Sequence, residues 1–272
     1  MQNASREVRY GVWLQNGYAL SVEQVVAFGV EAEKAGWGGV FVSDEPSNYS
    51  DPWTALAAIA AQTERIRLGT WVTPVPNNLP WRLAHILASL DHISGGRVIL
   101  GTGLGTPYEY KAFGGSYDAR ALGRKYDEAL EIITRLWSGE AVSLSGEFFT
   151  LKDAKLAVTP VQTPRIPILM ACWWPHKKPF RRAARWDGMM PYWPALTSEG
   201  QGPQGEEATG SIEEELQDLL AYYHQLTDEP GEIVLPYRPD EGYLDLCKEL
   251  EATWMLVTDV REVEEIRQGP PG

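Results

Sequence analysis

The chain has 272 residues, of which 44% are hydrophobic and 22% are charged, and its formal net charge at pH 7 is -13. This composition is ordinary for a globular protein with a sizeable core, and the length suits one α/β domain. The negative charge would repel a phosphate backbone, which argues against a nucleic acid as partner. No apolar run approaches the roughly 18 residues of a membrane-spanning helix, so no membrane span is expected.

The rarer residue types point to a cytoplasmic protein without a metal. Cys172 and Cys247 are the only cysteines, and two thiols far apart make a weak case for a disulfide. The four histidines show no metal-ligand spacing. The first nine residues are polar and contain no apolar signal segment, so no secretion signal is expected and we predict a cytoplasmic location.

Strand-like and helix-like segments alternate from the start of the chain. Ser21 and Gln24 have the spacing of a capping box, and Asp51 followed by Pro52 is typical of a helix start. Predicted strands cover Arg9 to Leu14, Gly39 to Ser43, Ile66 to Val75 and Val98 to Gly101. Predicted helices cover Ser21 to Ala35, Asp51 to Thr63, Pro80 to Ile93 and Leu122 to Trp137.

The alternation breaks once, at residues 142–158. Two short strands, Val142 to Leu144 and Phe148 to Leu151, flank a turn there and predict a hairpin outside the main sheet. The alternation then resumes with predicted strands at Ile166 to Ala171, Gly188 to Trp193, Ile233 to Tyr237 and Thr253 to Val257. The remaining predicted helices are Pro179 to Trp186, Ser211 to Thr227, Leu244 to Leu250 and Val260 to Gln268. Residues 197–210 are rich in Gly, Ser, Thr and Glu and predict a mobile loop.

Eight strands and eight helical segments therefore alternate, and no shift in composition marks a second domain. We predict a closed (β/α)8 barrel, a TIM barrel, formed by residues 1–272 as a single domain with the small hairpin as an excursion. An open, doubly wound sheet is the alternative, because eight parallel strands can also lie flat.

In a parallel barrel the chemistry lies where the strands end, at their carboxyl ends. Five tryptophans stand at the carboxyl ends of predicted strands, which suits a large, flat and partly apolar ligand, although any single one of them could simply close the barrel. Glycines at 101, 103 and 105 would let a flat ring lie on bare backbone. The five tryptophans are Trp13, Trp71, Trp173, Trp174 and Trp193.

Charged residues near the predicted strand ends suggest two further roles. Lys177 and Lys178 stand at the start of a short basic helix, where an anion such as a phosphate could bind, although the cluster could also be a solvated basic face. Asp44 and Glu45 are adjacent in a strand and point to opposite faces, so they are not expected to act as a pair. Glu45 is the candidate acid–base residue, and Glu109 is a further candidate.

Several motifs resemble the bacterial luciferase-like superfamily of flavin-dependent oxidoreductases, and they keep the order of that superfamily along nearly the whole chain. They are Ala32-Glu-Lys-Ala-Gly-Trp37, Asp51-Pro-Trp-Thr-Ala-Leu-Ala-Ala-Ile-Ala60, Thr63-Glu-Arg-Ile-Arg-Leu-Gly-Thr70, Leu90-Asp-His-Ile-Ser-Gly-Gly-Arg-Val-Ile-Leu-Gly-Thr-Gly103 and Arg182-Ala-Ala-Arg-Trp-Asp-Gly188.

The resemblance implies a barrel that binds FMN, or the deazaflavin F420, at the carboxyl face, and often a homodimer. It implies a non-proline cis peptide in the third strand, by position at Trp71–Val72, and a phosphate region after the fifth strand, near Lys177 and Lys178. Many relatives that use F420 carry a histidine after the aspartate of the second strand. This chain has Glu45 there.

We therefore predict a flavin-dependent oxidoreductase, first of all a monooxygenase that uses reduced FMN and dioxygen on a small organic substrate. No nicotinamide fingerprint is present, so a separate flavin reductase is an expected partner, and residues 197–210 are a candidate lid. The alternatives are F420-dependent hydride transfer, a flavin-binding protein without turnover, and a barrel hydrolase with Asp44, Glu45 or Glu109 as acid and base.

The predicted site comprises a catalytic residue, a cofactor seat and a substrate pocket, with Glu45 as the catalytic residue. The predicted cofactor-binding residues are Trp71, Val72, Thr73, Gly103, Gly105, Ala171, Cys172, Trp173, Trp174, Lys177 and Lys178. The predicted substrate pocket contains Trp13, Asp44, Tyr108, Glu109 and Trp193.

Overall fold

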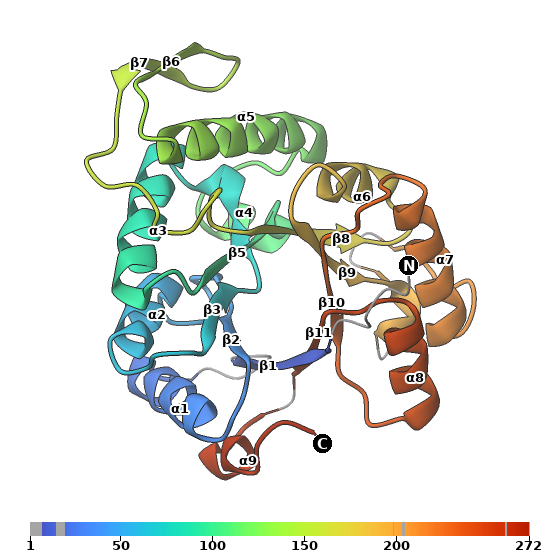
Figure 1. The fold of residues 1–272 in the computed structure, drawn as a ribbon. Helices are drawn as coiled ribbons and strands as arrows, with labels where there is room; N and C mark the ends of the chain where they lie inside the picture. The colour runs from blue at the N-terminus through green and yellow to red at the C-terminus, as the bar shows by residue number, and fades with distance from the viewer. Residues whose placement is uncertain (1–6, 15–19, 198, 203–204, 259, 272) are drawn as a thin grey trace.

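A computed structural model describes residues 7–14, 20–197, 199–202, 205–258 and 260–271. Its parallel strands form a ring, because the first strand pairs with the second on one side and with the last on the other. Figure 1 shows this ring with helices around its outside. The pairing of the first strand with the last confirms the predicted TIM barrel and excludes the open sheet.

The strands of the ring follow the predicted segments closely. In ring order they are β1 (Arg9–Leu14), β2 (Gly39–Val42), β3 (Arg67–Thr70) with its continuation β4 (Thr73–Pro74), β5 (Val98–Gly103), β8 (Ile168–Trp173), β9 (Gly188–Tyr192), β10 (Glu232–Pro236) and β11 (Trp254–Val257).

The helices begin where the sequence signals a cap. The hydroxyl of Ser21 accepts the backbone N–H of Gln24, whose side chain accepts the N–H of Ser21, and Ser211 and Glu214 form the same capping box. The predicted helices are α1 (Val22–Lys34), α2 (Pro52–Ala60), α3 (Pro80–Ser94), α5 (Ala119–Trp137), α6 (Lys177–Ala183), α7 (Ile212–His224), α8 (Glu241–Glu249) and α9 (Val263–Arg267). No described helix is both long and apolar enough to cross a membrane.

The helix α4 (Pro107–Ala112) was not predicted. It has six residues and starts at Thr106, whose hydroxyl accepts the backbone N–H of Glu109. Six residues are too few to show a helical repeat, although Thr106-Pro107 is a start signal that sequence reasoning could have used. This helix matters because it carries Glu109 to the carboxyl face of the barrel.

Side chains alternate between two apolar layers. Every second residue of a strand points into the barrel, and the others pack against the surrounding helices. The inner layer has room for large rings because glycines stand beside them: a Cβ on Gly69 would lie 2.5 Å from the ring of Phe41, and one on Gly39 would lie 2.9 Å from the ring of Trp254. The fully buried members of this layer are Phe41, Trp71, Ile99, Leu169, Met190, Val234, Trp254 and Leu256.

The third strand is interrupted at Trp71 and Val72. Residues on both sides of the break, in β3 and in β4, pair with β5, so the strand continues after a local kink. The peptide between Trp71 and Val72 is cis, as the resemblance implied. Beside the kink β5 comes so close that a Cβ on Gly101 would lie 1.9 Å from the carbonyl oxygen of Thr70.

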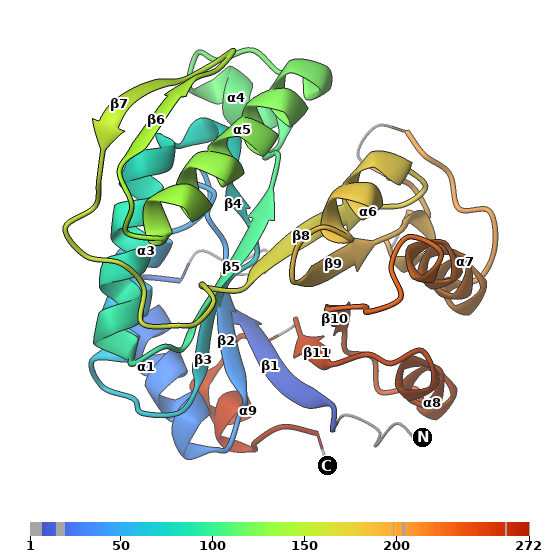
Figure 2. The ribbon, with the colours of Figure 1, turned by 45° about the horizontal axis from the view of Figure 1, so that its top comes forward.

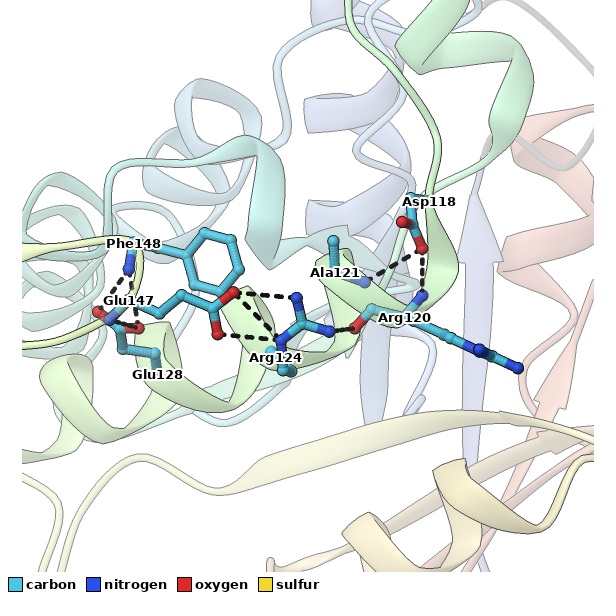
Figure 3. A network of polar contacts seen from close by, with 7 residues as sticks. All are labelled: Asp118, Arg120, Ala121, Arg124, Glu128, Glu147 and Phe148. Carbon is cyan, nitrogen blue, oxygen red and sulfur yellow. Dashed lines mark hydrogen bonds and ion pairs between the residues drawn. The ribbon is translucent and has the colours of Figure 1, made fainter.

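The predicted excursion is a separate two-stranded antiparallel sheet, β6 (Val142–Ser145) and β7 (Thr150–Ala154), which lies outside α5 in both views (Figures 1 and 2). At the turn of this hairpin, the backbone N–H groups of Glu147, Phe148 and Phe149 donate to the carboxylate of Glu128 on α5. Arg124, one helical turn earlier, binds Glu147 with two nitrogens, each 2.9 Å from a carboxylate oxygen (Figure 3).

The substitution Glu128→Ala should lower the free energy of unfolding by about 1–3 kcal/mol, because three backbone N–H groups lose their acceptor. Arg124→Ala is the matched control, and it should cost at most about 1 kcal/mol because an exposed ion pair contributes little. Urea unfolding of both variants measures the difference. Equal losses would show that the carboxylate of Glu128 does not hold the hairpin.

Candidate functional site

Aromatic side chains close the barrel interior at its carboxyl end. Trp13 on β1 and Trp71 at the kink lie with ring centroids 5.6 Å apart and planes tilted by 32°. The indole N–H of Trp13 donates to the hydroxyl of Ser43, 2.9 Å away, which fixes the ring over β2. Trp13, Val72 and Tyr192 pack on the inner apolar layer from above and are partly exposed, so they line the mouth.

The opposite side of the mouth is built from small residues. Gly103, Val72 and Ala171 meet there, since a Cβ on Gly103 would lie 2.8 Å from the side chain of Val72 and 3.6 Å from the Cβ of Ala171. Next to this floor of small side chains the ring of Trp173 stacks on Tyr192 at 5.7 Å and 24°. A floor of small side chains beside stacked aromatic rings suits a flat ligand.

The side chains of three predicted site residues point away from the barrel interior. Cys172, Trp174 and Trp193 belong to the layer between barrel and helices, and the structure does not bring their side chains to the mouth. Alternation along the strands explains this, because Ala171 and Trp173 take the inward positions of β8 and Tyr192 that of β9. Burial raises the pKa of the Cys172 thiol, as expected for an inert core cysteine.

The predicted phosphate lysines have separate surroundings. The ammonium of Lys177 lies 3.4 Å from the ring centroid of Trp174 and 4.0 Å from that of Tyr222 on α7, so it faces the helix layer. Burial lowers the pKa of Lys177. Lys178 is exposed. Beside them His176 contacts the carboxylate of Glu206. Of the two lysines, only Lys178 has an ammonium that is not held against aromatic rings in this way.

A cavity of about 370 Å³ opens beside the kink, where β2 and β4 end and α4 begins. Asp44 and Glu109 both line it, so the structure brings together two residues of the predicted pocket. Tyr108, a third, is 62% exposed and is not part of the lining. The remaining lining residues are Pro46, Pro74, Asn77, Asn78, Tyr110, Phe113 and Gly115.

Asp44 is the most perturbed carboxyl of this cavity. Burial raises its pKa to about 6, and the nearby carboxylates of Asp51, Glu109 and Glu45 add to the rise, while a hydrogen bond from Thr73 opposes it. The Oδ2 atom of Asp44 is buried and has no hydrogen-bond partner among the described residues. Asp44 therefore keeps its proton to a higher pH than an ordinary aspartate does.

The other two acidic candidates differ in position. Glu109 is only 3% exposed, and its carboxylate accepts the backbone N–H of Ser47 at 3.3 Å. Glu45, the predicted catalytic residue, is half-buried, accepts the side-chain amide of Asn48 at 3.2 Å and does not line the cavity. Glu109 and Asp44 thus share one cavity, and Glu45 lies beside it.

Sequence reasoning left out several residues of the site. Tyr192 was within reach, because counting inward positions along β9 from buried Met190 leads to Tyr192 and not to Trp193. Asn77 and Asn78 had no signal in the sequence, since they lie at the end of a 3-10 helix of only three residues, Val75–Asn77, that follows β4. Among the residues that the structure describes, no group of three His, Cys, Asp or Glu side chains could hold a metal ion.

Comparison with known proteins agrees with this architecture. The family model described as luciferase-like monooxygenase matches residues 8–202. The chain belongs to this family. Among the curated relatives, an F420-dependent glucose-6-phosphate dehydrogenase of Microbacterium testaceum is 34% identical over 171 residues, which cover 57% of this chain and 50% of that protein. The chain spans about half the length of the curated relatives that it matches first.

Solved structures share the fold over almost the whole chain. A monooxygenase from Streptomyces bottropensis superposes with a TM-score of 0.76 at 22% identity, and it covers 96% of both chains. A coenzyme F420-dependent tetrahydromethanopterin reductase from Methanopyrus kandleri gives a TM-score of 0.75 at 14% identity and the same coverage. At these identities the likeness establishes the barrel fold.

Asp44→Asn should change how stability depends on pH. The folded-state pKa of Asp44 lies above its ordinary value, so the wild-type protein loses stability as pH rises from about 4 to about 6. The variant lacks this loss. Above about pH 6 its free energy of unfolding should therefore exceed that of the wild type by up to about 3 kcal/mol. Urea unfolding at several pH values measures this difference, and Glu45→Gln, which leaves Asp44 in place, should keep most of the wild-type decline. If the free energies of unfolding of Asp44→Asn and the wild type differ by the same amount at every pH, the raised pKa of Asp44 is contradicted.

Proposed function

We propose that this chain is an oxidoreductase that binds a tricyclic redox ring, FMN or F420, across the carboxyl mouth of its barrel. The observation that carries the proposal is the shape of that mouth. Gly103, Val72 and Ala171 form a floor of small side chains, and Trp13, Trp173 and Tyr192 lie around it. A flat ring needs such a floor, and apolar walls that exclude water.

The residues at the mouth suit the ring of the cofactor. The residues predicted to bind its anionic tail are less suitable. Val72, Gly103 and Ala171 would lie against the ring, and Trp173 would border it. Of the predicted phosphate contacts, the proposal retains Lys178, because the ammonium of Lys177 is held by two aromatic rings. Once bound, the cofactor supplies the electron transfer, and the protein orients it and keeps water away.

Two kinds of chemistry remain for this site. A monooxygenase that uses reduced FMN is our first candidate, because the description of the matching family names that activity and an aromatic mouth limits access of water. Hydride transfer with F420 is the second, and it is supported by the names of the first curated relatives and by a buried carboxyl at the cavity. A separate flavin reductase, a small organic substrate and a homodimer remain parts of the first candidate.

The other two alternatives receive less support. Asp44 and Glu109 do line one cavity, as a hydrolase would require, but the curated relatives that match are named as oxidoreductases and monooxygenases. A flavin-binding protein without turnover would share the mouth. It would bind the cofactor tightly and show no oxygen uptake that depends on substrate.

Purified protein should bind FMN or F420, and Ala171→Leu should raise the dissociation constant about tenfold or more, a loss of about 1.4 kcal/mol, because the added atoms occupy the floor. Titration of each cofactor, followed by absorbance and fluorescence, measures this, and the cofactor that binds decides between the two candidates. Ala58→Leu, at a half-buried site of α2, is the control and should bind as the wild type does. Failure of the wild type to bind either cofactor would overturn the proposal.

A further inference from the structure

Asp44 reaches the cavity from the loop that follows β2, and three other elements surround it there. The kinked strand contributes Thr73 of β4, the end of the 3-10 helix Val75–Asn77 contributes Asn77 and its cap Asn78, and α4 contributes Glu109. The carboxyl of Asp44 thus lines a partly open cavity, and Pro74 of the same lining pairs with Gly103 of the proposed cofactor floor.

The charges that face Asp44 all have the same sign. Its neighbours are the carboxylates of Glu45 on the same loop, Asp51 at the start of α2 and Glu109 on α4. Within the described part of the chain, none of these four acids forms an ion pair with a lysine, arginine or histidine. A carboxyl in such surroundings gains from holding a proton, and its raised pKa agrees with this geometry.

The hydroxyl groups below Asp44 give an ionised carboxylate little support. Thr73 donates to the hydroxyl of Thr70 at 3.1 Å, and Thr70 donates to the carbonyl oxygen of Gly101 at 2.9 Å. Because a hydroxyl has one proton, Thr73 cannot donate to Thr70 and to Asp44 at the same time. If Asp44 ionises and takes the proton of Thr73 in a hydrogen bond, the contact between the two threonines loses its proton.

Glu45 lacks these features. Its carboxylate accepts a hydrogen bond from Asn48 and lies outside the cavity lining. Asp44, next to it in sequence, lines the cavity instead, and its Oδ2 atom is buried and finds no hydrogen-bond partner in the described part of the chain. The position that sequence reasoning chose for acid–base chemistry is therefore one residue away from the one that the geometry favours.

We propose that Asp44, and not Glu45, is the acid–base catalytic residue of this site, and that its substrate is a small molecule with a carbonyl or alcohol oxygen bound in the adjoining cavity. This inference rests on the proposed function. In the reducing direction the O–H bond of Asp44 would break to give its proton to the carbonyl oxygen while the carbonyl carbon gains a C–H bond from a hydride, which a bound FMN or F420 would supply and by which it would be oxidised. The carbonyl would become an alcohol, and the carboxylate of Asp44 would regain a proton from solvent. The reverse direction takes the proton from the alcohol.

Infrared difference spectra of the protein without cofactor, recorded between about pH 5 and about pH 8, test the proton on Asp44 directly. The carbonyl band of a protonated carboxyl should disappear with a midpoint of about 6 in the wild type. The band should be absent in Asp44→Asn and present in Glu45→Gln. Its midpoint should fall in Glu109→Gln, because one negative neighbour is removed while the side chain keeps an acceptor for Ser47. A band that persists in Asp44→Asn, or that vanishes in Glu45→Gln, overturns the proposal.

Two further measurements separate this inference from the proposed function. If the wild type binds neither FMN nor F420, the proposed function fails while the infrared result still stands. If it binds one of them, Asp44→Asn should keep that binding within about threefold and should lower kcat on carbonyl or alcohol substrates about 100-fold or more, whereas Glu45→Gln should change it little. Unchanged turnover in Asp44→Asn overturns the inference alone. Circular dichroism checks the fold, and if Asp44→Asn does not fold, the midpoint shift in Glu109→Gln decides the question.

Discussion

The narrow interior of the barrel is the constraint on which the rest of the structure depends. Eight strands enclose an interior just wide enough for side chains to fill, and this chain places the large rings of Phe41, Trp71 and Trp254 there. They fit only because Gly39 and Gly69 carry no side chain beside them. The inner layer then supports Trp13, Val72 and Tyr192 above it, so packing deep in the barrel determines the shape of the mouth.

Electrostatics adds a second property to this mouth. The cavity at its edge gathers acidic groups without a described cation to balance them, and Asp44 reaches it on the loop that follows the buried strand β2. Such a carboxyl costs stability when it ionises, and in this fold it lies beside the place where the chemistry of a barrel is usually found. A buried acid in a structural core would normally have a partner, as Asp91 has in Gln162.

The fold could be predicted from the sequence because its signals are local. The caps at Ser21 and Ser211 and the alternation of apolar segments are properties of short stretches, and they led to the strands and to eight of the described helices within a few residues. The site depends on which way a side chain points at the end of a strand. A shift of one residue there exchanges Tyr192 for Trp193, or Asp44 for Glu45, and sequence alone does not fix that register. The contact of Lys177 could not be predicted for another reason, since its partner Tyr222 lies on α7, far away in the sequence.

The hydrogen bonds between β1 and β11 have a consequence for the newly made chain. Tyr10 pairs with Met255, and the ring of Phe41 meets that of Trp254 at 5.7 Å, so residues made early have partners that are made much later. Until β11 has left the ribosome, β1 is an exposed edge and the glycine-lined interior lacks one wall. During synthesis, the open side of β1 would therefore be a place where another chain could pair with this one.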